Sequence, residues 1–92
     1  MISEKDKAII LKCAKKYNLD TVILFGSSID REDAYVIDIG IKVIEPGQFF
    51  EFYGELLLLL SKRVDVINLS KENSFNKLIE KEGIKLYGWV KR

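Results

Sequence analysis

The chain has 92 residues, of which 48% are hydrophobic and 32% are charged, and its formal net charge is +1. These values predict one small globular domain over residues 1–92 and exclude a disordered chain, while the dispersed Lys and Arg residues give no sign of a nucleic-acid-binding face. No apolar run approaches the roughly 18 residues of a membrane span, so no membrane partner is expected and the expected location is the cytoplasm.

The residue types that are missing narrow the possible chemistry. The chain has no histidine, which excludes imidazole catalysis and His-ligated zinc. Cys13 is the only cysteine, so there is no internal disulfide, and its helical spacing from other apolar residues indicates core packing. Any chemistry must therefore use carboxylates, hydroxyls, lysines or a metal held by oxygen atoms.

Residues 4 to 17 are expected to form an amphipathic helix. Ser3 begins a capping signature, with Asp6 in the position that reaches back to the cap amide, and Asn18 suits a left-handed residue that ends the helix. The apolar residues recur on one helical face: Ile9, Ile10, Cys13, Ala14 and Tyr17.

The next two elements are predicted strands separated by a short polar segment. Thr21 to Phe25 is rich in β-forming residues and stops at Gly26, and residues 28 to 33 suit a turn or one to two turns of helix. Tyr35 to Ile44 alternates, which places one set of side chains on the core face and the other on the opposite face. The first set is Tyr35, Ile37, Ile39, Ile41 and Val43, and the second is Val36, Asp38, Gly40, Lys42 and Ile44.

The second half of the chain continues the alternation of helices and strands. Pro46-Gly47 precedes a predicted helix over 48–60. Residues 62–69 form a predicted strand with Asp65, Ile67 and Leu69 on one side. A predicted helix over 73–82 ends at Gly83, and an extended tail follows over 84–90. The first two strands are too close for a parallel crossover. We therefore expect an α+β fold with a small mixed sheet of three or more strands and helices packed on one face.

Asp38 is the first candidate site residue, because a carboxylate in an Ile/Val-rich strand must be hydrated, paired or bound to a cation. The alternative is a solvated outer face shared with Lys42. Gly26 directly after a strand leaves room for an anion to approach the backbone, and Ser27 and Ser28 add hydroxyls. A helix that begins there would favour phosphate further.

Asp65 is the second candidate, in the apolar run Val64 to Ile67. Beside a metal-bound triphosphate, its carboxylate could accept the proton of an attacking hydroxyl. The alternative is a salt bridge to Arg63, to Lys62, or to Lys42 across the sheet.

These signals together resemble the minimal nucleotidyltransferase (MNT) family of the DNA polymerase β superfamily. The family pattern is an apolar strand, Gly-Ser, a variable loop, Asp-x-Asp in the second strand and a third Asp in a later strand; here it falls on Phe25-Gly26-Ser27, Val36-Ile37-Asp38 and Val64-Asp65-Val66. The resemblance implies a polymerase β palm-like fold, with Gly26, Ser27 and Ser28 on phosphate and Asp38 and Asp65 as metal-binding and catalytic residues. It also implies Mg²⁺, ATP or another nucleoside triphosphate, and a hydroxyl acceptor. Many small prokaryotic members act as antitoxins beside an all-helical HEPN partner.

Val36 departs from this pattern, because it stands where the first Asp of Asp-x-Asp is expected and has no ligand atom. In a second alignment Asp38 is the first Asp and Gly40 replaces the second. Either way one paired carboxylate is missing, unless Glu32 or Asp33 reaches in from the loop. The resemblance therefore implies a catalytically impaired, partner-binding domain with weak or lost Mg²⁺ binding; the alternative is an active Mg-dependent nucleotidyltransferase.

The helix over 48–60 carries more apolar residues than one buried face requires. A helical wheel places Phe49, Tyr53, Leu56, Leu57 and Leu60 in the core stripe and leaves Phe50, Phe52, Leu58 and Leu59 outside it. The excess indicates a protein contact, with a HEPN-type partner or a second copy, and Trp89 is a further candidate for that contact. The alternative is that the later strand and helix cover it.

Overall fold

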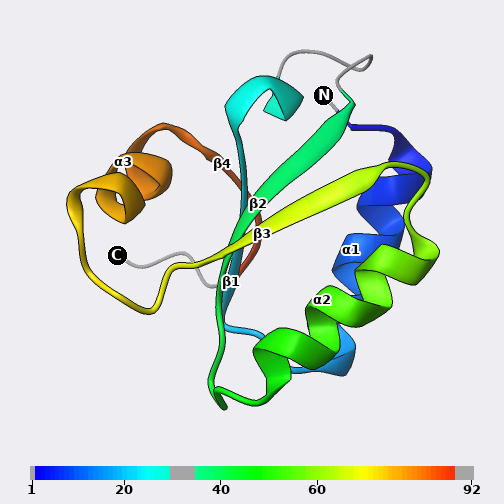
Figure 1. Cartoon of the computed structure of the whole chain (residues 1–92), viewed down its shortest axis with the longest axis horizontal. Helices are drawn as coiled ribbons and strands as arrows, with labels where there is room; N and C mark the ends of the chain where they lie inside the picture. Colours follow the sequence, from blue (N-terminus) through cyan, green and yellow to red (C-terminus); the bar gives the residue numbers. More distant parts are fainter. Residues whose placement is uncertain (1, 30–34, 89–92) are drawn as a thin grey trace.

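The computed structural model describes residues 2–29 and 35–88, so the predictions for Glu32, Asp33, Trp89 and Val90 lie outside the described part. Helices and strands alternate along the chain (Figure 1). The elements are α1 (Glu4–Lys16), β1 (Thr21–Phe25), the short 3₁₀ helix η1 (Gly26–Ile29), β2 (Val36–Lys42), α2 (Gln48–Leu59), β3 (Arg63–Asn68), α3 (Ser74–Glu82) and β4 (Ile84–Gly88). None of the helices in this part of the chain is long and apolar enough to cross a bilayer.

The sheet has four strands in the order β3-β2-β1-β4. As predicted, β1 is antiparallel to β2; β2 and β3 run parallel across the α2 connection, and β4 adds an antiparallel edge beside β1. The sequence predicted β4 only as an extended tail. The expectation of helices on one face is wrong: α1 and α2 cover one face, and α3 lies on the other (Figure 1).

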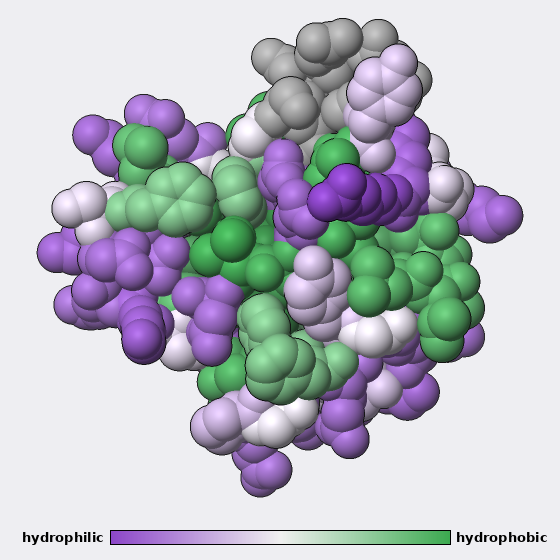
Figure 2. Space-filling model, in the orientation of Figure 1, coloured by the Kyte–Doolittle hydropathy of each residue, from purple (hydrophilic) through white to green (hydrophobic). Residues whose placement is uncertain are grey.

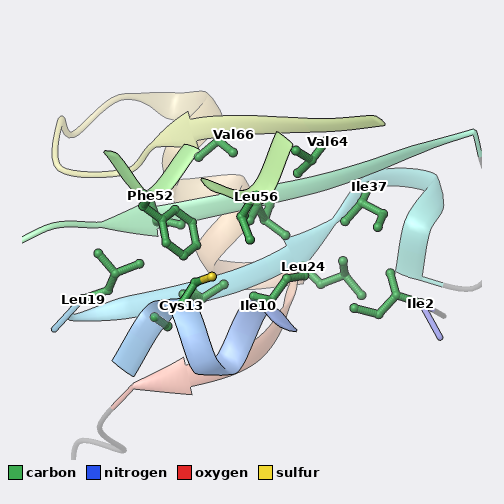
Figure 3. Packing of buried hydrophobic residues seen from close by; sticks show 14 residues of the cluster. Ile2, Ile10, Cys13, Leu19, Leu24, Ile37, Phe52, Leu56, Val64 and Val66 are labelled. Atoms are coloured by element: carbon green, nitrogen blue, oxygen red, sulfur yellow. The ribbon is translucent and has the colours of Figure 1, made fainter. Parts of the chain in front are cut away.

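The main core lies between the sheet and the helices α1 and α2. Figure 3 shows Phe52 and Leu56 of α2 close to Ile10 and Cys13 of α1, and all four belong to the same buried cluster. The predicted alternation of β2 is confirmed, because Ile37, Ile39 and Ile41 are all buried in this core. Tyr35 precedes the strand and is exposed, so the predicted core face begins at Ile37.

A second, smaller cluster explains why α3 covers the other face. Ile23 of β1, Leu69 after β3 and Ile79 of α3 are buried together, with Phe25 and Ile67 packed against them. These side chains come from the strand face opposite the main core, which is also the face of Asp38. Because that face carries apolar residues in its middle, a helix must bury it.

Asp6 does not make the capping contact that its spacing predicts. Ser3 does cap α1, since its Oγ accepts the Asp6 N–H at 3.1 Å, and Asn18 has the predicted left-handed φ of 53°. The buried Asp6 carboxylate instead accepts the backbone N–H and the hydroxyl of Ser61, at 3.2 and 2.6 Å. It therefore ties the start of α1 to the connection between α2 and β3.

The buried face of α2 is rotated relative to the predicted one. Phe49, Tyr53, Leu56 and Leu60 pack on the core as predicted, but Phe52 is fully buried while Leu57 is exposed. Neighbouring positions on a helix differ by about 100°, so Phe52 and Leu56, four residues apart, centre the stripe away from Leu57. Tyr53 marks its other edge, where its hydroxyl donates to the Val64 carbonyl at 3.3 Å.

Candidate functional site

The structure places the two candidate carboxylates side by side. Asp38 of β2 and Asp65 of β3 are partners in the parallel register, so their side chains leave the sheet on the same face from adjacent strands, about 4.8 Å apart along the hydrogen-bonding direction. Phe25 of β1 is the partner of Asp38 on its other side. Asp65, Asp38 and Phe25 thus form one row across the end of the sheet.

Gly26 continues this row and cannot be replaced by another residue without strain. Its φ of +70° lies in the left-handed region, and a Cβ atom built on it would lie 2.7 Å from Oδ2 of Asp38. The backbone therefore turns directly against the Asp38 carboxylate. That this turn receives phosphate stays a prediction. The helix that follows is a single 3₁₀ turn, too short to supply a macrodipole.

The backbone of Ser27 and Ser28 belongs to this turn. Their predicted hydroxyl contacts fall on side chains outside the described part of the structure, so these roles stay predictions.

Asp38 carries an electrostatic cost in the protein alone. Burial is the main cause that raises the pKa of its carboxyl group above the ordinary value of 3.8, and the neighbouring Asp65 charge raises it further. Both effects penalise the ionised form. A bound cation would remove this penalty, because it neutralises the repulsion and replaces the lost hydration.

The donor atoms fit a hard divalent cation. Two carboxylates on adjacent strands supply oxygen ligands, and Mg²⁺ in nucleotide sites is held by one or two carboxylates together with phosphate oxygens and water. Among residues 2–29 and 35–88 no group of three or more His, Cys, Asp or Glu side chains gathers for a metal.

The surroundings of Val36 and Gly40 differ, although both lie two residues from Asp38 on the same strand face. Val36 is half-buried at the start of β2. Gly40 is buried beneath Leu69, and a Cβ atom there would lie 2.8 Å from two Leu69 side-chain carbons. Of these two positions, Gly40 is the one where Leu69 leaves no space for a carboxylate.

Lys42 does not form the ion pair with Asp65 that was the alternative for that carboxylate. Its Nζ lies 3.3 Å from Oε1 of Glu80 on α3. Lys16 of α1 pairs with Glu55 of α2 at 2.9 Å. Both lysines are thus held by carboxylates away from the Asp38 and Asp65 pair.

Replacing Asp38 with asparagine should raise the melting temperature of the metal-free domain at neutral pH. Between 3.8 and its raised pKa, the native state binds more protons than the unfolded chain, so stability falls as pH rises through that window and stays lower above it. An uncharged amide at this position carries no such penalty. Thermal unfolding from pH 3 to 8 should show an advantage of Asp38→Asn that is greatest near neutrality and disappears below 3.8.

Magnesium should make the wild type melt at a higher temperature than Asp38→Asn, because a ligand that binds only the native state stabilises it. Addition of MgCl₂ should raise the melting temperature of the wild type but not of Asp38→Asn. Glu45→Gln, which removes an exposed carboxylate in the turn before α2, is the matched control and should follow the wild type. An Asp38→Asn variant less stable than the wild type at pH 7 without metal would contradict this account.

No family model matches the chain, and no curated protein matches it. Solved structures share its fold. A mutant MntA–HpeT toxin–antitoxin complex, in which two aspartates two positions apart are replaced by glutamate, matches at a TM-score of 0.72 and 20% identity over 90% of this chain and 73% of that chain.

Two further structures give the same result. A tri-AMPylated Shewanella oneidensis HEPN toxin in complex with its MNT antitoxin matches at a TM-score of 0.68 and 21% identity, over 91% of this chain and 71% of that one. A toxin–antitoxin structure with AMP-PNP matches at a TM-score of 0.67 and 21% identity, over 95% of this chain and 75% of that one. The likeness confirms the predicted α+β nucleotidyltransferase fold.

Proposed function

We propose that this chain is an MNT-type antitoxin-like domain that binds a HEPN-type helical protein and keeps a Mg-nucleotide site with impaired catalysis. The observation that carries the proposal is the row formed by Asp65, Asp38 and Gly26, beside which the half-buried Val36 lies at the start of β2. The similar structures include an MNT antitoxin with its HEPN toxin and a complex with AMP-PNP. The proposal includes a cytoplasmic, prokaryotic setting, where ATP and Mg²⁺ are present.

In this proposal the residues of the row have separate roles. The Gly26 backbone, with the Ser27 and Ser28 hydroxyls, receives the phosphates, because a left-handed glycine lets the chain approach an anion closely. Asp38 and Asp65 hold Mg²⁺, which supplies charge neutralisation for the triphosphate. The Asp65 carboxylate would also accept the proton of an attacking hydroxyl, as the hydroxyl oxygen bonds to the α-phosphorus and pyrophosphate leaves with the bridging oxygen.

Catalytic impairment follows from the hydrocarbon at position 36. Phosphoryl transfer depends on positioning and charge stabilisation, and paired carboxylates supply both. With Val36 in the place of one of them, the site can bind a nucleotide but aligns it poorly. The second candidate function, an active Mg-dependent nucleotidyltransferase that uses a protein or other hydroxyl acceptor, is favoured by the intact Gly26, Asp38 and Asp65.

The partner surface in this proposal is the outer side of α2. Figure 2 shows apolar atoms exposed over this helix. Phe50 and Leu58 are 76% and 85% exposed, and Leu57 and Leu59 are also open to solvent. Gly54 lies between them on the helix, and a Cβ atom there would meet nothing within 4 Å, so core packing does not explain this glycine. An exposed apolar stripe with a glycine in the middle suits close approach of a partner helix.

Replacing Leu58 with glutamate should therefore abolish partner binding without unfolding the domain, since its side chain is outside the core. The tagged wild type, expressed in its own host, should capture a small all-helical HEPN-type protein, and Leu58→Glu should reduce that capture at least tenfold. Ile44→Glu is the matched control: Ile44 is also an exposed aliphatic residue, but it lies beyond β2, and capture should persist. Quantitative mass spectrometry of the captured material measures the effect.

Two results would count against this partner. Capture of the helical protein by Leu58→Glu at the wild-type level would show that α2 is not the surface involved. A wild type that forms dimers in sedimentation analysis, separated into monomers by Leu58→Glu, would identify a second copy of the chain as the occupant.

A further inference from the structure

An apolar groove lies beside the row of site residues, between η1 and α3. Its volume is about 350 Å³, within the range of small-molecule sites. The apolar lining consists of Phe25 and Ile29 on one side and Phe75, Leu78 and Ile79 on the other, with Gly26 at the junction. The Phe25 and Phe75 rings meet edge to face, with their centroids 6.1 Å apart and an interplanar angle of 86°.

The position of the groove connects it to the candidate metal and phosphate site. Phe25 is the register partner of Asp38, so the ring begins one strand away from the carboxylate and on the same face of the sheet. Gly26 lines the groove, and the side on which a Cβ atom would stand faces the Asp38 carboxylate. A ligand whose charged end lies at Gly26 and Asp38 can therefore place its other end in the groove without crossing another element.

The outer wall of the groove is more apolar than the fold requires. Ile79 already buries the contact between α3 and the sheet, with Leu69 and Ile23. Phe75 and Leu78, which lie one turn apart on α3, are nevertheless 54% and 49% exposed, and both line the groove. These two side chains offer an apolar contact that the folded chain leaves open.

The charges of the groove select the kind of group that can enter. Glu82 is the one charged residue among the described residues that line it. A carboxylate at the rim repels phosphate, while the aromatic and aliphatic walls favour a flat, uncharged ring. The groove therefore suits the base of a nucleotide rather than its phosphates.

We propose that this groove between η1 and α3 holds the base of a nucleoside triphosphate whose phosphates lie at Gly26 and whose metal lies at Asp38 and Asp65. The inference rests on the proposed nucleotide site and adds to it the residues that recognise the nucleoside. Phe75 and Leu78 cover one face of the base, and the edge of Phe25 meets it beside the strand. Stacking of this kind accepts any base, because every base has a π-face.

Calorimetric titration of the wild type with Mg–AMP-PNP and with Mg–tripolyphosphate tests this directly, because the second ligand has phosphates but no base. The nucleotide should bind at least tenfold more tightly than tripolyphosphate, as expected for one stacked base. Phe75→Ala and Leu78→Ala should each remove most of that difference by weakening AMP-PNP binding, while tripolyphosphate binding stays as it was. Both residues are half exposed, so the variants should fold.

The matched control is Ile44→Ala, which removes an exposed apolar side chain from the segment after β2, away from the groove lining, and should leave both affinities unchanged. Equal affinities of the wild type for the two ligands would overturn the assignment of the groove to the base, and so would an AMP-PNP affinity that neither α3 substitution lowers. Both results would leave the phosphate and metal site in place. Binding of neither ligand would overturn the nucleotide site and the groove together.

Discussion

Replacing Val36 with aspartate should raise Mg²⁺-dependent transfer of AMP from ATP by about a hundredfold or more. A carboxylate at this position would join Asp38 and Asp65 on one face of the sheet. Additional stabilisation of the charge that develops at the transferred phosphoryl group is worth a few kcal/mol, and each ~1.36 kcal/mol changes a rate tenfold. Val36 is half-buried at the start of β2, so the substitution should not disturb the core.

Transfer is measured as radioactive label moved from ATP to the copurified helical partner. The control is the double substitution Val36→Asp with Asp38→Asn, which keeps the new carboxylate but removes an old one and should return the signal to background. A wild type as active as Val36→Asp would show that catalysis is not impaired and would favour the active enzyme. Absence of any gain, in a variant that still binds Mg–AMP-PNP, would contradict the role assigned to position 36.

Replacing Gly40 with aspartate should strongly destabilise the protein instead of activating it. Gly40 is buried, and a Cβ atom there would lie 2.8 Å from two carbons of Leu69. The substitution adds overpacking to the burial of a carboxylate with no room for water, so it should cost about 3 kcal/mol or more. That is a large share of the ~5–15 kcal/mol by which small domains are stable.

Urea unfolding measures this cost, with Gly40→Ala and Val36→Asp in parallel. Gly40→Ala should lose less, since it meets Leu69 without burying a charge, and Val36→Asp should stay close to the wild type in the presence of Mg²⁺. Gly40→Asp with wild-type stability and a gain of transfer activity would mean that the second alignment, with Gly40 in place of a carboxylate, is the right one.

Alternation along the strands was enough to predict much of the fold and the face of the site. Ile37, Ile39 and Ile41 had to share one side, so Asp38 had to face the other, and the same reasoning placed Asp65 with Ile67. The close spacing of β1 and β2 predicted their antiparallel pairing. These predictions succeeded because a period of two residues is a local property of the chain.

Other features depend on contacts that local patterns do not encode. The rotation of α2 placed Phe52 rather than Leu57 in the core, because the helix is apolar nearly all round and several stripes were almost equivalent. The capping pattern predicted that the Asp6 carboxylate would accept a hydrogen bond at the start of its own helix. In the folded chain that carboxylate instead accepts hydrogen bonds from Ser61. The second layer formed by α3 could have been suspected from Ile67 and Leu69, apolar residues on the strand face opposite the main core.

The groove had no signal in the sequence. Phe25 and Phe75 are far apart along the chain and belong to a strand and a helix that the sequence does not connect. They meet only because α3 packs against β1, and Phe25 lies beside Asp38 only because of the β1–β2 register. Registers and packing contacts of this kind are set by the tertiary fold.

The most direct measurement of the central claim is paramagnetic broadening of amide NMR signals by Mn²⁺ added in trace amounts with AMP-PNP. A cation held between β2 and β3 should broaden the signals of Gly26, Asp38 and Asp65 first and leave those of Ile44 and Leu58 sharp. Broadening centred elsewhere on the domain, or none at all, would show that these two strands do not hold a metal-bound nucleotide.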